Sequence, residues 1–287
     1  MTPGVLRAVL RPGGVAVITG GASGIGLAAA RRFAGLGMRV AIADLGAVRL
    51  AAAKGTLAAE ASGGEGAVLA VEADVANAAA MRDFAQAVRE RLGGADLLMN
   101  NAGIEPPSST LAADNWERVL AVNLWGVVNG TQAFVPGMVD RGEPGIVVNT
   151  GSKQGITTPP GNPAYNVAKA GLKAFTEALA HELRTTPGCR VTAHLLIPGF
   201  VFTGLTRRDR TEKPAAAWTP EQTVDFMLER LGQGDFYILC PDNDVSRALD
   251  ERRILWAAGD IVENRPALSR WHPDFAEAFA AFVRGGG

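Results

Sequence analysis

Short apolar runs alternate with alanine-rich segments along most of this chain of 287 residues. The runs have the length of strands and are apolar on both faces, and the segments between them have the length of helices. Strands of this kind occur in sheets that helices cover on both sides, and the alternation favours a parallel sheet with right-handed crossovers. We expect strands at 15–20, 39–44, 66–74, 95–103, 145–152, 190–199 and 235–242, with helices near 24–36, 46–62, 77–92, 112–139, 163–185 and 219–232.

The composition fits an ordinary globular protein, with 47% apolar and 20% charged residues. The net charge of −1 gives no reason to expect a nucleic acid or an anionic membrane as partner. No run reaches the length of a transmembrane helix, and residues 1–14 lack the apolar stretch of a signal peptide. For these reasons we expect a cytoplasmic protein. We also expect one domain over residues 1–287, because no Pro/Ser-rich linker divides the chain.

The cysteines and histidines predict neither disulfides nor a metal site. Cys189 and Cys240 lie in apolar, strand-like stretches, which favours buried free thiols. His181, His194 and His272 lie far apart and lack the spacing of metal ligands.

A glycine-rich segment, TGGASGIG (19–26), follows the first apolar run and opens the first long helix. Without β-carbons, its backbone can approach a pyrophosphate closely, and the start of the helix offers amide donors. The spacing is G-x-x-x-G-x-G, and its place between strand and helix predicts a dinucleotide-binding turn. The expected cofactor contacts here are Gly20, Ser23, Gly24, Ile25 and Gly26.

Asp44 ends the second apolar run, 24 residues after Gly20. A carboxylate at this point can accept the ribose hydroxyls of NAD and repel the 2′-phosphate of NADP. No basic residue follows at once, since Arg49 is five residues further on. We therefore expect NAD as cofactor; the alternative is an ordinary aspartate that begins a turn.

Tyr165 lies four residues before Lys169 in the segment NPAYNVAKAGLKAF, although the chain has only two tyrosines. Asn162 is expected to cap the helix that carries them, and Pro163 suits its first position. The TTPG stretch at 185–188 is expected to end it. The two side chains then lie one turn apart on one face. Taken alone, this pair could also be a core tyrosine beside a surface lysine.

Hydride chemistry at a secondary alcohol gives this spacing a purpose. A free tyrosine, with a pKa near 10, is a poor base at neutral pH. The ammonium of Lys169 and a positive nicotinamide ring would both lower the pKa of Tyr165. Ser152 ends a strand 13 residues before Tyr165, and its hydroxyl can hold the substrate oxygen. We expect all three residues to be catalytic.

These motifs occur together with NNAG (100–103), NLWG around Asn123 and PGFVFT (198–203). In order and rough spacing they resemble the short, single-domain branch of the short-chain dehydrogenase/reductase family, over about residues 12–242. The resemblance implies a Rossmann-like, doubly wound parallel sheet of seven strands in the order 3-2-1-4-5-6-7, with helices on both faces.

The resemblance also implies further site residues. Asn123 would produce a local kink that holds a water next to Lys169, completing a catalytic tetrad with Ser152 and Tyr165. Lys169 would also hold the ribose hydroxyls. The remaining cofactor contacts are Asp74 and Val75 at the adenine, Asn100, Asn101, Ala102 and Gly103 along the cofactor, where Asn100 also braces the central strands, and Pro198, Gly199, Val201 and Thr203 at the nicotinamide.

By family position, the substrate pocket draws on Gln154, Phe200, Phe202 and Trp218. Ile104, Glu105, residues 154–160 and Asn162 adjoin it, and residues 203–232 form a lid with its following helix. These residues predict an uncharged, hydrophobic or aromatic substrate. A carboxylate becomes plausible if an arginine of the cluster Arg207, Arg208 and Arg210 points inward; otherwise that cluster is a solvated loop.

The expected activity is hydride transfer between NAD and a secondary alcohol or ketone. Imine, enoyl or epimerase-like chemistry on the same fold is one alternative. A non-catalytic, NAD-sensing protein is another, which would not need Ser152, Tyr165 and Lys169 together. We expect a homodimer or homotetramer built on the long helices after the fourth and fifth strands, and a C-terminal extension of two helices over residues 243–287.

Overall fold

A seven-stranded parallel sheet forms the centre of the molecule in the computed structural model, which describes residues 3–207 and 209–285. The strand order is β3-β2-β1-β4-β5-β6-β7, as the resemblance implied. The order reverses between β1 and β4, and a crevice for ligands is expected there at the carboxyl ends of the strands. The strands are β1 (Val15–Thr19), β2 (Arg39–Asp44), β3 (Val68–Glu72), β4 (Leu97–Asn100), β5 (Gly145–Thr150), β6 (Val191–Ile197) and β7 (Tyr237–Leu239).

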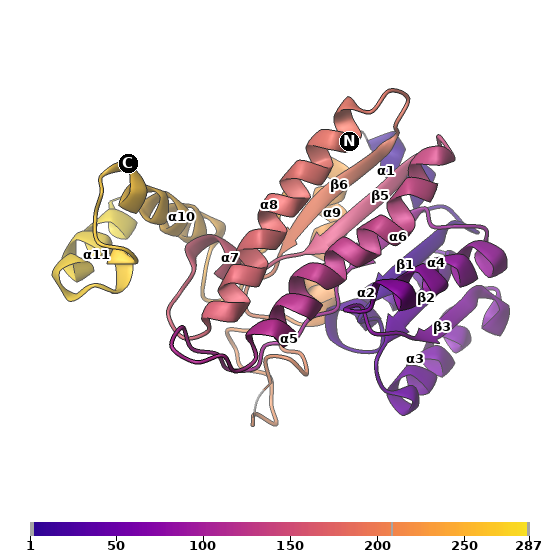
Figure 1. Ribbon diagram of the computed structural model, residues 1–287, viewed down its shortest axis with the longest axis horizontal. Helices are drawn as coiled ribbons and strands as arrows, with labels where there is room; N and C mark the ends of the chain where they lie inside the picture. Colours follow the sequence, from indigo (N-terminus) through magenta and orange to yellow (C-terminus); the bar gives the residue numbers. More distant parts are fainter. Residues whose placement is uncertain (1–2, 208, 286–287) are drawn as a thin grey trace.

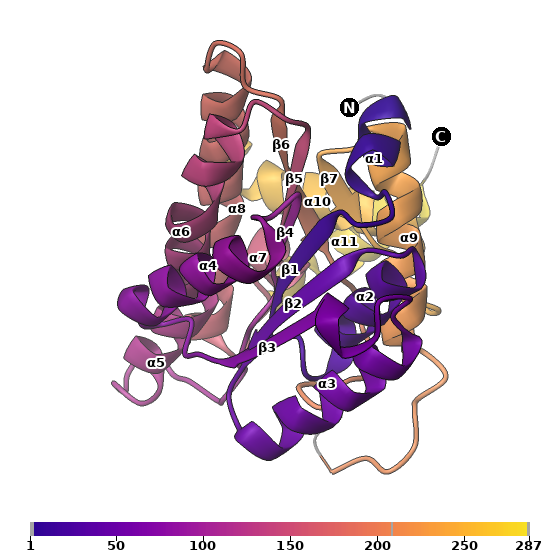
Figure 2. The same cartoon turned by 90° about the vertical axis from the view of Figure 1, so that its right-hand side faces the viewer.

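Helices cover both faces of the sheet, as Figure 2 shows with the sheet close to edge-on. None of the helices in the described ranges is long and apolar enough to cross a membrane. One face carries α1 (Pro3–Val9), α2 (Gly24–Gly35), α3 (Ala47–Glu60) and α9 (Pro220–Gln233). The other face carries α4 (Ala78–Leu92), α5 (Trp116–Leu120), α6 (Gly126–Asp140) and α8 (Pro163–Thr185). A short 3-10 helix, η1 (Gly64–Ala67), precedes β3.

The two larger hydrophobic cores pack against opposite faces of the sheet. Along β1, Ala16 and Ile18 pack into the core under α2 and α9, whereas Val15 and Val17 pack into the core under α4 and α6. Successive side chains of a strand point to opposite faces of the sheet, so β1 is buried on both of its faces. The continuous apolar runs of the sequence have this physical cause.

The helical segment expected at 112–139 is interrupted. α5 is followed by one π-helical turn, Ala121–Trp125, and only then by α6. Asn123 lies in this turn with its side chain fully buried. Its amide donates to the carbonyl of Ile104, and its Oδ1 accepts from the Ile104 amide, both at 2.8 Å. The local distortion implied at Asn123 is therefore a π-turn, a feature that recurs at functional sites.

The start of α8 differs from the expected cap. The Asn162 side chain does not cap the helix. Its amide donates to the Pro106 carbonyl at 3.0 Å, and the hydroxyl of Ser108 accepts from the Ala164 amide at 3.0 Å. Asn162 is thus used to bind the loop after β4, and a residue distant in sequence supplies the cap. The end of α8 at Thr185 agrees with the expected stop.

Past β7, α10 (Arg247–Val262) and α11 (Ala276–Arg284) project to one side of the sheet in Figure 1. Trp256 forms a small core there with Phe279 and Phe282, at ring distances of 5.4 and 5.2 Å. Because this cluster joins α10 to α11, the extension is an ordered unit. Two short 3-10 helices, η3 (Ser269–Trp271) and η4 (Pro273–Phe275), connect the two.

The two cysteines are free thiols. Cys240 is buried just after β7, as expected, and burial raises its pKa to about 12. Cys189 is only half-buried, because it lies in the turn before β6.

Candidate active site

The glycine-rich segment forms a tight turn between β1 and α2. Gly20 has a φ of +65°, and its amide donates to the Ala43 carbonyl at 2.8 Å. A Cβ placed on Gly26 would lie 2.2 Å from the Gly20 carbonyl oxygen, so no larger residue fits without backbone movement. Ser23 precedes α2 but does not cap it, which leaves the first amides of the helix available to an anion. Ile25 lies in this first turn, half-buried.

Asp44 is tied to the turn through its carboxylate. One oxygen accepts from the Ala22 amide at 2.9 Å. The other accepts from the Leu45 amide at 2.8 Å and from the Arg49 guanidinium at 3.1 Å. The sequence offered no reason to pair Arg49 with Asp44, because the two are five residues apart. Arg49 lies in the first turn of α3, and this turn brings its guanidinium to the Asp44 carboxylate, so the two side chains form an ion pair.

The end of β4 meets the glycine-rich turn directly. A Cβ on Gly20 would lie 2.8 Å from Cα of Ala102, and the Asn101 amide donates to the Thr19 hydroxyl at 2.9 Å. Asn100 points the other way, into a buried network, and donates to Asn149 of β5 at 2.9 Å. This bond braces the two central strands.

The segment after β6 closes the same edge of the sheet. A Cβ on Gly24 would lie 3.2 Å from the side chain of Thr203, so the two expected cofactor segments are in contact. Val201 is buried and pairs with the backbone of Trp218. Pro198 is buried, and at Gly199 a Cβ would lie 2.8 Å from Lys153 Nζ.

The two residues expected at the adenine lie after β3. Asp74 is exposed, and its carboxylate accepts from the Ala76 amide at 2.9 Å. Val75 is buried, and its carbonyl accepts from Asn129 of α6 at 2.9 Å. Asp74 therefore shapes a turn that presents both residues at the carboxyl end of the sheet.

Four residues expected to be catalytic converge beside this edge. Tyr165 and Lys169 are buried in the first turns of α8, and Lys169 Nζ lies 5.6 Å from the Tyr165 ring centre. The Lys169 ammonium donates to the Thr150 carbonyl at 2.7 Å. The Ser152 hydroxyl accepts from the Gln154 amide at 3.2 Å and lies close enough to the Tyr165 phenol to favour its charged form. A Cβ on Gly103 would lie 3.4 Å from Asn123 Oδ1 and 3.9 Å from Lys169 Nζ.

The protonation of this cluster differs from the expectation. Burial, and then the nearby charge of Glu105, raise the pKa of Tyr165, and only the Ser152 hydroxyl lowers it. The expected lowering by Lys169 is therefore wrong for the structure described. Burial also lowers the pKa of Lys169 to about 8, against a smaller opposite effect of Glu105. Glu105 is thus an electrostatic neighbour of both groups, a role that the sequence did not reveal.

A hollow of about 640 Å³ opens next to Glu105. Of the four residues expected in the pocket, Gln154 lines it, and its amide donates to Glu105 at 3.1 Å. Gln154 belongs to α7 (Gln154–Thr157), the short helix after Ser152. The other lining residues are Glu105, Pro107, Pro159, Pro160, Gly161, Asn162 and Asp209. Pro107 and Gly161 were not expected, and family position was the only signal for the rest.

Phe200, Phe202 and Trp218 do not line this hollow. The Trp218 ring packs against Phe226 of α9, with ring centres 5.6 Å apart. In the basic cluster, the Arg210 guanidinium lies 5.8 Å from the Phe200 ring. Arg207 is exposed, and Arg208 lies outside the described residues.

Within residues 3–207 and 209–285, no three His, Cys, Asp or Glu side chains gather as the ligands of a metal would. His194 is held structurally, since its ring nitrogens lie 2.7 Å from the Asp235 carbonyl and 3.0 Å from the Thr192 hydroxyl. Burial lowers its pKa.

The sheet order and the glycine-rich turn, beside a cluster of the half-buried Ser152 with the buried Tyr165 and Lys169, define an oxidoreductase of the Rossmann class that uses a nicotinamide cofactor. The chain belongs to the short-chain dehydrogenase/reductase family. A family model described as short chain dehydrogenase matches residues 14–214.

Known relatives agree with this assignment. The chain is 33% identical to 1-deoxy-11-beta-hydroxypentalenate dehydrogenase of Streptomyces avermitilis, over 84% of this chain and 89% of that one. A short chain dehydrogenase/reductase from Burkholderia phymatum, solved in complex with NAD, is similar with a TM-score of 0.78 and 31% identity, over 90% and 97% of the two chains. L-sorbose reductase from Gluconobacter frateurii, solved with NADPH and L-sorbose, has a TM-score of 0.67 and 28% identity, over 77% and 90%.

Proposed function

We propose that this protein transfers a hydride between NAD and a secondary alcohol or ketone. The observation that carries the proposal is the cluster in which the buried Lys169 Nζ lies 5.6 Å from the buried Tyr165 ring and the Ser152 hydroxyl adjoins the phenol. A non-catalytic NAD sensor would not need this arrangement. The relative named as a hydroxypentalenate dehydrogenase supports an alcohol as substrate.

The residues at the edge of the sheet fit a dinucleotide. The close turn at Gly20 and Gly26 lets the backbone approach a pyrophosphate, and the start of α2 offers amides to it. In the proposed arrangement Asp44 and Asp74 adjoin the adenosine half, and the segment from Pro198 to Thr203 adjoins the nicotinamide. Bound there, the nicotinamide would accept or donate the hydride.

The proposed mechanism assigns one task to each residue of the tetrad. Ser152 holds the substrate oxygen by a hydrogen bond, and Tyr165 Oη takes the hydroxyl proton during oxidation or returns it during reduction. Lys169, whose Nζ lies 5.6 Å from the Tyr165 ring centre, would bind the ribose hydroxyls. Asn123 fixes the loop at Ile104 and keeps the π-turn open for a water that connects Lys169 to solvent.

A panel of alcohols with NAD tests this function. Purified protein should form reduced cofactor with alicyclic, aryl or steroidal secondary alcohols, measured by absorbance. Apolar alcohols should be preferred to small polyols, because Pro107, Pro159 and Pro160 line the hollow. We propose that the reacting end of the substrate is uncharged, since Glu105 and Asp209 would repel an anion there. Strong preference for a small polyol, or no turnover at all, would refute the proposal.

The preference for NAD rests on Asp44. Asp44→Asn keeps an acceptor for the Ala22 amide but removes the charge that repels a 2′-phosphate, and it leaves Arg49 unpaired. The ratio of kcat/KM for NAD to that for NADP should fall about 100-fold, the size of effect expected from a close repulsive pair. Steady-state kinetics with both cofactors measure it. Equal use of the two cofactors by the parent protein would contradict the assignment.

We also propose that the protein is a homodimer or homotetramer built on α6 and α8. Trp125 and Val167, large apolar residues on and next to these helices, are 58% and 49% exposed, which supports a contact on this face.

A further inference from the structure

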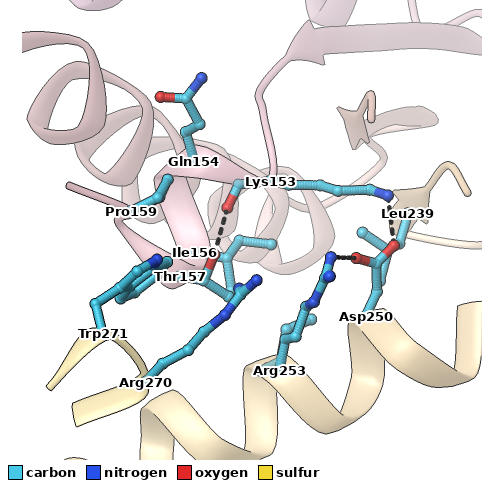
Figure 3. Close-up of a pocket in the computed structure, with 11 residues that line it drawn as sticks. Lys153, Gln154, Ile156, Thr157, Pro159, Leu239, Asp250, Arg253, Arg270 and Trp271 are labelled. Atoms are coloured by element: carbon cyan, nitrogen blue, oxygen red, sulfur yellow. Dashed lines mark hydrogen bonds and ion pairs between the residues drawn. The ribbon is translucent and has the colours of Figure 1, made fainter. Parts of the chain in front are cut away.

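A second cavity, of about 290 Å³, lies between α7 and the C-terminal extension (Figure 3). The proposed mechanism does not use it. Its walls are partly apolar, from Ile156, Pro159, Leu239, Ile254 and Trp271. It shares Gln154 and Pro159 with the hollow beside Glu105. The two spaces are therefore neighbours on either side of one short stretch of chain.

The cations of this cavity are unequally paired. Lys153 Nζ lies 2.5 Å from one Asp250 oxygen and 3.3 Å from Asp242, so its charge is compensated. Arg253 reaches Asp250 only at 4.0 Å, and its Nε is buried without a hydrogen-bond partner. Across the described residues, no carboxylate lies within ion-pairing distance of Arg270. Three cations thus face two carboxylates.

The two arginines face the same space. Figure 3 shows the guanidinium groups of Arg253 and Arg270 pointing from the C-terminal segment toward α7. The Arg270 guanidinium lies over the rings of Trp271 and Phe279, at 4.7 and 5.2 Å. Burial, and then the charge of Arg253, lower the pKa of Arg270 to about 10, so Arg270 is still charged at neutral pH. An anion between them would relieve this repulsion.

The position of Arg270 is set by the core of the extension. The hydroxyl of Ser269, its neighbour in η3, accepts from the Trp256 indole at 2.8 Å, and the Ser269 amide donates to Asp260 at 3.1 Å. The Arg265 guanidinium lies 4.0 Å from the Trp256 ring and 3.0 Å from Asp260. Because these contacts hold η3 on α10, Arg270 is oriented before any ligand binds.

We propose that Arg253 and Arg270 bind the carboxylate of an otherwise apolar substrate, whose alcohol or ketone lies in the hollow beside Glu105. The planar guanidinium fork matches a carboxylate, and a single negative charge balances the cavity. The carboxylates of Glu105 and Asp209 would repel the charged end of such a substrate from the hollow, and the two arginines would attract it to the cavity. Together they would fix the direction in which the substrate binds. This inference rests on the proposed function, and it adds a charged end to the uncharged substrate expected from the sequence.

The test uses a binding probe that needs no turnover. Cyclohexanecarboxylate is titrated by calorimetry into the protein with saturating NAD, and cyclohexanecarboxamide serves as the neutral match. The acid should bind at least about 10-fold more tightly than the amide, and Arg270→Gln should weaken it about 10- to 100-fold. Arg270→Lys, which keeps the charge without the fork, should fall between. The control is Arg247→Gln on α10, which removes an exposed ion pair with Glu251. It should leave the affinity for cyclohexanecarboxylate unchanged.

A second arm connects the cavity to the substrate. With the best alcohol of the panel, cyclohexanecarboxylate should inhibit competitively, and Arg270→Gln should raise its inhibition constant about 10-fold. Arg247→Gln should leave both the turnover and this inhibition unchanged. Equal binding of acid and amide, or full affinity in a folded Arg270→Gln protein, would overturn the proposal. Binding without competition would refute the assignment to the substrate. Failure of the alcohol panel alone leaves the calorimetric result intact, so the two proposals fail separately.

Discussion

Replacement of Tyr165 by phenylalanine is expected to lower kcat by about 10²- to 10⁴-fold, the range that general acid–base catalysis contributes. The variant keeps the ring that packs in α8 but loses the oxygen that would move the alcohol proton. NAD affinity should change little, because the phenol is one of several proposed cofactor contacts. Steady-state kinetics and a fluorescence titration of NAD separate the two effects.

The chain contains its own control for this change. Tyr237, the only other tyrosine, lies on β7 and is hydrogen-bonded to Glu177 at the surface. Tyr237→Phe should therefore keep full turnover. Since burial raises the pKa of Tyr165, alcohol oxidation by the parent should rise as the pH increases and the phenol loses its proton. A Tyr165→Phe protein that retains most of its activity would end the proposed mechanism.

Gly26→Ala is expected to have the largest effect on the cofactor turn. The new Cβ would lie 2.2 Å from the Gly20 carbonyl oxygen and 2.6 Å from the side-chain nitrogen Nδ2 of Asn101, so the backbone of the turn must move. Overpacking of this kind costs about 1–3 kcal/mol of unfolding free energy. NAD affinity should fall at least about 10-fold, because the displaced amides no longer face the pyrophosphate.

Gly35→Ala, at the other end of α2, is the matched control. A Cβ on Gly35 meets nothing within 4 Å, so this change should leave NAD binding intact and alter the unfolding free energy by at most about 1 kcal/mol. Urea denaturation and NAD titration of both variants provide the comparison. Normal NAD affinity in Gly26→Ala would show that the turn does not hold the dinucleotide.

The sequence was sufficient for the sheet because its signals are local. The side chains on both faces of β1 are apolar, and the same holds along most of the central strands. Each strand therefore appears in the printed sequence as a short apolar run between two helical segments. The spacing of Tyr165 and Lys169 is local in the same sense, since one helical turn brings them together. The resemblance to a known family then added the strand order and the role of Asn123, which lies on another element.

Local signals failed where distant segments interact. The cap of α8 comes from Ser108, more than fifty residues before the helix, and periodicity cannot show that. Asn123 was assigned to a distorted site, but only the structure identified the π-turn and its double hydrogen bond to Ile104. The pKa of Tyr165 depends on its burial and on Glu105, neither of which spacing determines.

Local pattern in the sequence therefore determined the elements of this protein, the glycine-rich turn and the Tyr–Lys pair, because backbone hydrogen bonding and side-chain periodicity act over a few residues. The tertiary structure alone decided which charges meet: Arg49 with Asp44, Glu105 with the catalytic cluster, and Arg253 with Arg270 beside α7. Electrostatic interactions depend on distance in space and on burial, and both are set only when the sheet, the loops and the C-terminal extension have packed together.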